Sequence, residues 1–326
     1  MTKTFLVTGA SGFIGRRLTK YLKVRGFYVR ALLRTPSEGP WDESYLAELG
    51  VDDISAEVMS SIDGVFHLAG VAHTTISNSS EIENHYWQVN VKGTSQLLQA
   101  AVDANVKCFV NFSSVKAGGE HPEDCLDENS DYQPADVYGQ SKYEAEKLVL
   151  QAGHESGMHV CNLRPALIYG KGIKGNIYKM MRSIEQGRFP PVPEFGNRRS
   201  MVSLDDLIEA AWLAMNTSTA SGETYIVTDG VEYSTREIYQ SIVMAYGMTV
   251  PRYCFPKSVF RFGAKVGDFM NNLFGIEMPL DSYKLNKLSS SACYKADKVR
   301  RELGWKPQFS FADVLSDIIK EMGDKY

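Results

Sequence analysis

The sequence predicts an α/β protein with a doubly wound parallel sheet and a smaller C-terminal α/β lobe. In the first half of the chain, short apolar runs alternate with longer segments of helical periodicity. After Arg164-Pro165 the pattern changes, because glycines and the group Pro190-Pro191-Val192-Pro193 punctuate shorter helices. We expect residues 1–165, with about 198–230, to form the larger domain. Residues 166–197 and 231–326 are expected to form the smaller, substrate-binding lobe.

The alternation begins at the N-terminus. Thr4–Thr8 is a short apolar run, and Ile14, Leu18 and Leu22 then recur every four residues, as on one face of a helix. Strands and helices in this order form a parallel sheet with right-handed crossovers. Further strands are predicted at Tyr28–Leu33, Val65–Leu68, Cys108–Phe112, His159–Leu163 and Thr224–Val227. Further helices are predicted at Ile82–Asn105, Val137–Ala152, Asp205–Met215, Ser234–Tyr246 and Phe311–Met322.

Composition limits the functional classes. The chain has 326 residues and 44% apolar content, enough for a full core. Its net charge of −4 and pI near 5.9 leave no extended basic field, so we expect no nucleic acid partner. The five cysteines include no C-x-x-C pair and predict reduced thiols in a cytoplasmic protein. The six histidines show no ligand spacing, so no metal site is expected.

The sequence predicts no transmembrane segment. The strand at Thr4–Thr8 leaves no room for a signal peptide before it. No apolar stretch reaches the roughly 18 residues that a membrane span needs. The nearest candidate, Phe255–Leu280, is interrupted by Lys257, Arg261, Lys265 and Asp268. We expect a helix of the smaller lobe or a dimer contact there; a surface helix that touches a membrane is the alternative.

A glycine-rich loop, Thr8-Gly9-x-x-Gly12-x-x-Gly15, follows the first strand and opens the first helix. Glycine lets the backbone turn tightly and approach a diphosphate, and the helix N-terminus offers unpaired N–H groups to the anion. This context predicts a Rossmann-type dinucleotide site. The predicted cofactor-binding residues of the loop are Gly9, Ser11, Gly12, Phe13, Ile14 and Gly15.

The end of the second strand bears on the choice of cofactor. In NAD-selective sites an acidic residue there binds the ribose 2′-hydroxyl, but this chain has Arg34. Arg34, with Arg16 or Arg17, can instead pair with a 2′-phosphate, which favours NADP(H) over NAD(H). NAD(H) stays open. Further along, Asp53 and Ile54 are predicted to meet the adenine, and Leu68, Ala69 and Gly70 to pass beside the cofactor.

The pattern Tyr-x-x-x-Lys occurs five times, beginning at Tyr138, Tyr143, Tyr253, Tyr283 and Tyr294. Ser114 lies 24 residues before Tyr138, at the end of an apolar run that predicts a strand. Tyr143 lies five residues after Tyr138, about 140° around the helix, and the other three copies lie far past the series of strands and helices. Tyr138 and Lys142 share one face of a helix. A free tyrosine has a pKa of about 10, and a nearby ammonium together with an oxidised nicotinamide would favour the phenolate. We predict that Tyr138 exchanges a proton with the substrate, that Lys142 also binds the nicotinamide ribose and that Ser114 orients the reacting oxygen.

These motifs together resemble those of an extended short-chain dehydrogenase/reductase of the nucleotide-sugar epimerase/dehydratase family. The resemblance implies that Asn90 also contacts the cofactor, that Asn176, Arg199 and Ser114 contact a nucleotide-sugar substrate, and that the protein is a homodimer. The dimer would form through the helices near 82–105 and 137–152. The matching stretches are Thr8–Gly15, Val65–Gly70, Asn90–Thr94, Phe112–Ser114, Tyr138–Lys142, Leu163–Pro165, Arg199–Leu207 and Glu302–Pro307.

The resemblance leaves more than one reaction open. Dehydratases of the family place an acidic pair just after the serine, where this chain has Val115 and Lys116, so dehydration is not expected. An epimerase of UDP-hexose or UDP-N-acetylhexosamine would act at C4 with NAD held throughout. A 4-keto-sugar nucleotide reductase would consume NADPH. The run Ser113–Glu120 is similar to bacterial reductases that complete precursors of surface polysaccharide, and with Arg34 it favours the reductase.

Two other functions remain open for a chain with these motifs. A ketone reductase acting on steroids or aromatic substrates would have the same fold, but Arg198-Arg199 favours an anionic substrate. A catalytically silent relative that senses nucleotides would be expected to have lost the Tyr138–Lys142 pair, which this chain keeps.

Overall fold

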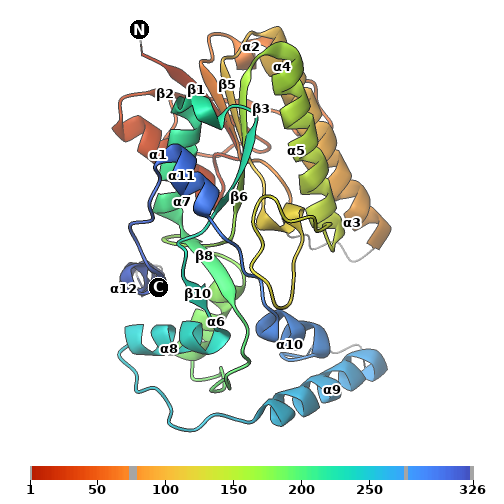
Figure 1. Ribbon diagram of the computed structural model, residues 1–326, viewed down its shortest axis with the longest axis vertical. Helices are drawn as coiled ribbons and strands as arrows, with labels where there is room; N and C mark the ends of the chain where they lie inside the picture. The colour runs from red at the N-terminus through yellow and green to blue at the C-terminus, as the bar shows by residue number, and fades with distance from the viewer. Residues whose placement is uncertain (1, 73–78, 275–277, 324–326) are drawn as a thin grey trace.

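The computed structural model describes residues 2–72, 79–274 and 278–323. Its centre is a seven-stranded parallel sheet of order β3-β2-β1-β4-β5-β6-β9, flanked by helices on both faces (Figure 1). This order confirms the predicted doubly wound, Rossmann-type α/β fold. The strands are β1 (Thr4–Thr8), β2 (Tyr28–Leu33), β3 (Glu43–Leu46), β4 (Gly64–His67), β5 (Cys108–Phe112), β6 (His159–Pro165) and β9 (Glu223–Val227).

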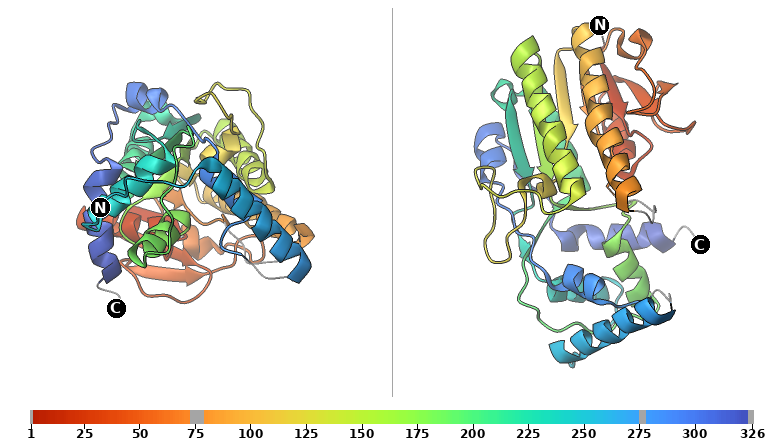
Figure 2. Two further views of the ribbon diagram at one scale, coloured as in Figure 1. Left: turned by 90° about the horizontal axis from the view of Figure 1, so that it is seen from below. Right: turned by 90° about the vertical axis from the view of Figure 1, so that its right-hand side faces the viewer.

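Helices cover the two faces of the sheet with separate apolar layers. One layer includes Leu18 and Leu22 of α1 and Leu207 of α7; the other includes Leu97 of α4 and Val149 of α5. Figure 2 shows α4 and α5 running side by side along their face. The helices around the sheet are α1 (Phe13–Val24), α2 (Ala56–Met59), α3 (Ser79–Tyr86), α4 (Gly93–Asp103), α5 (Val137–Ser156), α7 (Leu204–Asn216) and α11 (Asp297–Leu303).

A smaller lobe lies beyond the carboxyl ends of the large sheet (Figure 1). It holds a three-stranded sheet of order β10-β8-β7 and its own apolar cluster around Tyr169, Met181 and Phe311. Its strands are β7 (Leu167–Tyr169), β8 (Arg199–Ser203) and β10 (Glu232–Tyr233). Its helices are α6 (Asn176–Glu185), α8 (Thr235–Ala245), α9 (Lys257–Phe274), α10 (Ser282–Ser289) and α12 (Phe311–Gly323). Short 3-10 turns are η2 (Val115–Gly118) and η3 (Ser218–Ala220).

The exact division into domains stays a prediction, with two differences. β8 lies in the smaller sheet, although we expected about 198–230 in the larger domain, and the C-terminal segment is divided between the lobes. We expected all of 231–326 in the smaller lobe, but Val299 of α11 and the buried Trp305 pack into the core beneath the large sheet. The indole of Trp305 donates to the carbonyl oxygen of Asp206 at 3.0 Å, and the Asp206 carboxylate accepts from the backbone N–H of Gln308 at 2.9 Å. This contact joins two of the motifs that carried the family resemblance.

The long helix predicted at Ile82–Asn105 is divided into three segments. α3 is followed by a π-helical turn, η1 (Trp87–Lys92), and then by α4. π-Helical turns inside α-helices are rare and frequently lie at functional sites. Here the turn contains the predicted site residue Asn90.

The expectation that all cysteines are reduced thiols is wrong for two of them. Cys125 and Cys293 form a disulfide between Cα atoms 4.4 Å apart. A parallel bridge between Leu126 and Tyr294 brings the two segments together, although they are 168 residues apart in the sequence. A pairing between such distant loops leaves no spacing pattern to read. The free cysteines among the described residues are Cys108 and Cys161, both buried, and the exposed Cys254.

Candidate active site

The glycine-rich loop joins β1 to α1 at the carboxyl edge of the sheet. Gly9 has a φ of +66°, and a Cβ there would lie 2.8 Å from the backbone nitrogen of Ala69. α1 begins with Gly12 as N-cap, without a side-chain cap and without an acidic residue in its first turn. By contrast, Asp136 caps α5 and Ser203 caps α7. The open N-terminus of α1 therefore fits the diphosphate of a dinucleotide.

The rest of the loop is held by packing and by Arg16. Phe13 and Ile14 are partly buried against the core, so their side chains also anchor the loop. Arg16 donates to the carbonyl oxygen of Ser11 at 3.2 Å and to the hydroxyl of Ser37 at 3.2 Å. It thus lies between the loop and the segment that follows Arg34, whose side chain is exposed. Arg17, the other arginine considered, forms an ion pair with Asp205 at 2.5 Å.

The end of β4 is tied to the glycine loop through buried hydrogen bonds. The hydroxyl of Thr8 accepts from the backbone N–H of Ala69 at 3.0 Å and lies 2.8 Å from Nδ1 of His67. Nε2 of His67 lies 2.9 Å from the hydroxyl of Thr94, which donates to the carbonyl oxygen of Asn90. His67 is therefore neutral with its proton on Nε2, and burial lowers its pKa to about 3. His67 and Thr94 lie within the matching stretches Val65–Gly70 and Asn90–Thr94, but the sequence alone predicts no role for them.

The predicted adenine contacts, Asp53 and Ile54, lie in the loop that follows β3, an edge strand of the large sheet. Asp53 is exposed, and Ile54 is half-buried against the apolar layer under α4. Leu68 is also half-buried against the core, on the other face of the sheet.

Asn90 connects the loop after β4 to helix α5. It is buried; its Oδ1 accepts from the backbone N–H of Val71 at 2.8 Å, and its Nδ2 donates to the hydroxyl of Ser141 at 2.9 Å. A Cβ on Gly70 would lie 3.0 Å from Oδ1 of Asn90 and 3.7 Å from Nζ of Lys142. The loop, the π-helical turn and α5 therefore meet next to Lys142.

The first turns of α5 hold Tyr138 and Lys142. Asp136 caps this helix by accepting from the backbone N–H of Gly139 at 2.7 Å. One turn later, Nζ of Lys142 donates to the carbonyl oxygen of Phe112 at 2.7 Å, two residues before Ser114. The hydroxyl of Ser114 lies close enough to Tyr138 to lower the pKa of its phenol. The structure therefore brings Ser114, Tyr138 and Lys142 together at the end of β5.

Burial sets the pKa values of Tyr138 and Lys142 in this group. Burial raises the pKa of Tyr138 above 10.0, and the neighbouring Ser114 opposes that shift. Burial also lowers the pKa of Lys142 from 10.5 to about 8, with the charge of Glu146 opposing it. The expectation that an ammonium and an oxidised nicotinamide together favour the phenolate concerns the site with its cofactor bound and stays a prediction. In the protein alone, the burial of Tyr138 outweighs the effect of Ser114, and the phenol is protonated at neutral pH.

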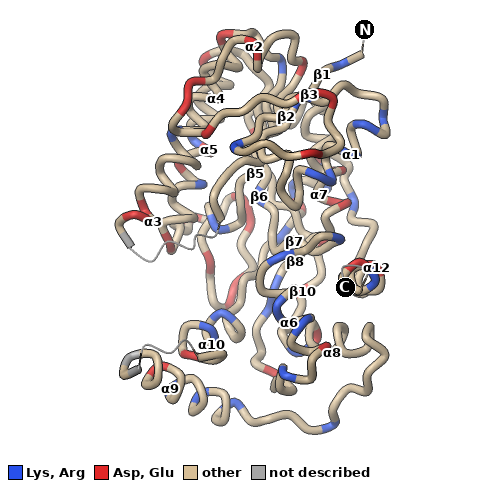
Figure 3. Tube along the Cα trace, turned by 180° about the vertical axis from the view of Figure 1, so that it is seen from behind, with Lys and Arg blue, Asp and Glu red and all other residues tan. Residues whose placement is uncertain are grey.

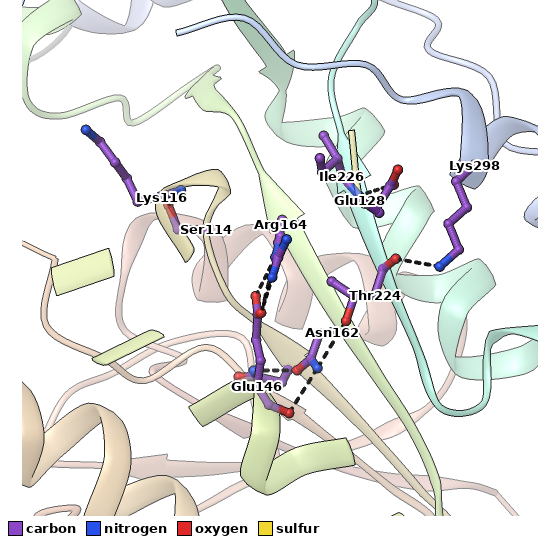
Figure 4. A network of polar contacts seen from close by, with 10 residues as sticks. Ser114, Lys116, Glu128, Glu146, Asn162, Arg164, Thr224, Ile226 and Lys298 are labelled. Atoms are coloured by element: carbon purple, nitrogen blue, oxygen red, sulfur yellow. Dashed lines mark hydrogen bonds and ion pairs between the residues drawn. The ribbon is translucent and has the colours of Figure 1, made fainter. Parts of the chain in front are cut away.

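A buried polar network lies one turn further along α5, on the face that carries Lys142. Figure 4 shows Glu146 and Arg164 facing each other, with an ion pair of 2.6 Å. The same figure shows Asn162, whose amide nitrogen donates to the carbonyl oxygen of Glu146 at 3.3 Å. Glu146 lies one turn after Lys142 on α5. The network therefore places a compensated negative charge beneath the buried ammonium.

Arg199 and Asn176, which with Ser114 are predicted to contact the substrate, have different surroundings. Arg199 of β8 donates to the carbonyl oxygen of Lys287, and burial lowers its pKa while the charge of Glu120 opposes that shift. Glu120 also pairs with Lys116 at 2.6 Å, which links Arg199 to the turn after Ser114. The sequence reading missed Glu120, although its i, i+4 spacing from Lys116 is a usable signal. Asn176 is the exposed first residue of α6, and no hydrogen bond or ion pair among the described residues joins it to Tyr138.

Among the described residues, no hydrogen bond joins Ser114 to the other Tyr-x-x-x-Lys copies. In two of them the lysine sits over the ring of its own tyrosine, at 5.1 Å for Tyr143 and 4.2 Å for Tyr283. Tyr253 is exposed. Tyr294 is buried and donates to the carbonyl oxygen of Gly119 at 3.0 Å.

Comparison with known proteins gives a consistent family. Residues 5–228 match the model of the NAD dependent epimerase/dehydratase family. A UDP-glucose 4-epimerase of Vibrio cholerae is 31% identical over 324 residues, covering 94% of this chain and 92% of the relative. A 3-beta-hydroxysteroid dehydrogenase of Mycolicibacterium neoaurum is 28% identical over 343 residues, covering 98% and 92%.

Solved structures show the same fold. The structure of MoeE5 in complex with UDP-glucuronic acid and NAD superimposes with a TM-score of 0.78. It covers 99% of this chain and 100% of that chain at 21% identity.

Proposed function

We propose that this chain, which belongs to the NAD dependent epimerase/dehydratase family, is an NADPH-dependent reductase of 4-keto-sugar nucleotides. The observation that carries the proposal is the grouping of Ser114, Tyr138 and Lys142 beside an uncapped glycine-loop helix. Bound cofactor would supply the hydride. The residues of this chain would bind the sugar carbonyl and move the proton.

Tyr138 is the proposed proton donor. Burial raises the pKa of its phenol, so the protonated form prevails at neutral pH. A carbonyl that receives a hydride develops negative charge on oxygen and needs a proton there. The Ser114 hydroxyl, which lies beside Tyr138, can orient that oxygen.

Lys142 is proposed to hold the cofactor ribose and to stabilise the tyrosine after it has given up its proton. Nζ bonds the carbonyl oxygen of Phe112 and lies beside Gly70, where the missing side chain leaves space. An ammonium has three donors, so two remain for a ligand.

Dehydration is not proposed, because the two positions after Ser114 have other roles. Val115 is buried in a small apolar cluster with Leu126 and Tyr294. Lys116 forms an ion pair with Glu120. Neither offers a carboxylate to remove a proton from the sugar.

The preference for NADP(H) rests on the arginines near the end of β2. Arg34 is exposed just after the strand, and Arg16 reaches Ser37 three residues further on. Two guanidinium groups near this edge suit a 2′-phosphate better than a 2′-hydroxyl. A phosphorylated cofactor that binds and leaves suits a reductase.

A second candidate is a 4-epimerase that acts on UDP-hexose or UDP-N-acetylhexosamine and holds NAD. It is favoured by the Vibrio cholerae relative, which is named a UDP-glucose 4-epimerase and is 31% identical. Tyr138 would then both remove and return the proton of the C4 hydroxyl.

The test incubates purified protein with UDP-hexoses, UDP-N-acetylhexosamines, their 4-keto-6-deoxy forms and a 3β-hydroxysteroid. Net consumption of NADPH with a keto sugar supports the reductase. Exchange of isomers without added cofactor supports the epimerase. Turnover of the steroid alone would contradict both.

We also propose that the protein is a homodimer. A groove between α4 and α5 is lined by Leu98, Val102 and Leu148, the kind of surface that a second pair of helices can cover. Sedimentation velocity measures the mass in solution, and a monomer at all concentrations would contradict the dimer.

A further inference from the structure

Helix α9 is already anchored to the protein by one face. Phe260, Ala264 and Gly267 of this face are buried, and the ring of Phe260 packs edge-on against that of Phe195 at 5.9 Å. At the far end, Asp268 accepts hydrogen bonds from the backbone N–H and the hydroxyl of Ser282 at the start of α10. The helix therefore needs no further apolar contact to hold its place in the lobe.

A second apolar face of α9 lies in solvent. Its members recur every three or four residues, and at 100° per residue their centre lies about 150° around the helix from the anchored face. Phe262 is 71% exposed, and Phe269 and Leu273 are each 60% exposed. We call this set the α9 stripe: Val259, Phe262, Val266, Phe269 and Leu273. Contiguous exposed apolar surface of this kind marks a binding face.

Basic residues form one border of the α9 stripe. Lys257, Arg261 and Lys265 share the sector between the stripe and the anchored face. Neither Arg261 nor Lys265 is paired with an acidic side chain in the described part of the chain. The acidic residue of this sector, Asp268, is hydrogen-bonded to Ser282. Figure 3 shows the basic positions along α9 and on the segment before it.

The position of α9 leaves the stripe accessible. Figures 1 and 2 show it at the outer end of the smaller lobe, away from the large sheet. The segment before it adds the exposed side chains of Arg252, Tyr253 and Phe255. No helix within the described ranges is both long and apolar enough to cross a bilayer. An apolar stripe bordered by lysine and arginine, with aromatic residues, is the pattern of a helix that lies in a membrane interface.

We propose that α9 docks this protein onto an anionic membrane surface. The helix would lie in the plane of the interface, with Phe262, Phe269 and Leu273 among the lipid chains. Arg261 and Lys265 would extend toward lipid phosphates, since long basic side chains reach polar groups from an apolar surface. A second copy of the chain is the less suitable occupant, because a self-complementary contact would bring the same unpaired cations together. The proposal does not depend on the reaction assigned to the active site.

The test is co-sedimentation of the full chain with vesicles of equal parts phosphatidylcholine and phosphatidylglycerol. The expected result is binding that falls with added salt and is much weaker on vesicles of phosphatidylcholine alone. The double variant Phe262→Glu/Phe269→Glu should lose binding. Arg261→Gln/Lys265→Gln should weaken it by roughly tenfold or more, because each cation contributes roughly a factor of five.

A matched control introduces the same two charges elsewhere. Leu46 and Met244 are 58% and 59% exposed, so Leu46→Glu/Met244→Glu should bind vesicles as the unchanged chain does. Thermal unfolding of every variant checks the fold, and turnover of a soluble sugar nucleotide should be unchanged by the α9 substitutions. Absence of vesicle binding by the unchanged chain would overturn the proposal. So would binding that Phe262→Glu/Phe269→Glu retains, or a dimer that these changes convert to a monomer.

Discussion

The carboxylate of Glu146 accepts two hydrogen bonds from the guanidinium of Arg164, at 2.9 Å from Nε and 2.6 Å from Nη2. Both side chains are buried, at 2% and 8% exposure. The charge of Glu146 also opposes the loss of the proton from Lys142, one turn away on α5. The pair therefore connects the core of the fold to the charge of the candidate active site.

Removing one partner of this pair should be costly. Arg164→Met leaves the Glu146 carboxylate buried without its cation, and we expect the free energy of unfolding to fall by about 3–5 kcal/mol. The double variant Glu146→Gln/Arg164→Met should recover most of the loss, because no buried charge remains unpaired. Urea unfolding of both variants measures the difference. Equal losses in the single and double variants would mean that the charge pairing is unimportant.

The pH dependence follows from Lys142. Its folded-state pKa, about 8, lies below the ordinary 10.5, so the unfolded chain binds more protons between these values. The free energy of unfolding should therefore gain a contribution from this residue as pH rises through that window. Turnover should do the opposite, because the ammonium is lost above a pH of about 8.

The double variant Glu146→Gln/Arg164→Met tests whether Lys142 causes this loss of turnover at alkaline pH. Without the carboxylate that raises the pKa of Lys142, the alkaline fall in kcat/KM should begin at lower pH. The full pH profile of both proteins measures it. An alkaline limb at the same pH in both would assign that limb to another group.

Tyr138→Phe removes the proposed proton donor while keeping the ring. Turnover should fall by roughly a thousandfold or more, since positioned acid–base groups contribute on that order. Cofactor affinity, measured by fluorescence titration, should be nearly unchanged. Tyr143→Phe is the matched control on the same helix and should keep full activity. Retained turnover in Tyr138→Phe would remove this residue from the chemistry.

Arg34→Ala tests the choice of cofactor. Loss of a charged hydrogen bond to the 2′-phosphate should weaken NADP(H) by roughly tenfold to a hundredfold, with little effect on NAD(H). Arg17→Ala is the control, because Arg17 is paired with Asp205. Isothermal titration with both cofactors gives the ratio. An equal effect of Arg34→Ala on both would end the argument for NADP(H).

Much of the large sheet could be predicted from the sequence, because its strands are short apolar runs bounded by turns. β1, β2 and β5 begin and end where the pattern predicts. β3 was missed because Glu43–Leu46 alternates in burial without an apolar run. The strands of the smaller sheet were missed because they are short or polar, as Leu167–Tyr169 and Glu232–Tyr233 are. Their pairing is decided by tertiary contacts.

The candidate site, like the sheet, could be predicted from the sequence only in part. Local spacing placed Tyr138 and Lys142 on one helix face, and the strand before them placed Ser114 nearby. The partners that set their charges come from distant parts of the chain. Arg164 is on β6, 18 residues from Glu146, and Glu120 influences Arg199 across the two lobes. Burial, which dominates the pKa of Tyr138, depends on the packing of the whole fold.

The central claim is that this protein reduces a 4-keto-sugar nucleotide, and isotope transfer tests it most directly. Purified protein is given a UDP-4-keto-6-deoxy-sugar and NADPH that carries deuterium at the transferred position. The product is then analysed by mass spectrometry. We predict deuterium at C4 of the sugar in proportion to the NADPH consumed, and none with Tyr138→Phe. Failure to transfer deuterium, together with exchange of sugar isomers when no cofactor is added, would contradict the reductase and identify an epimerase.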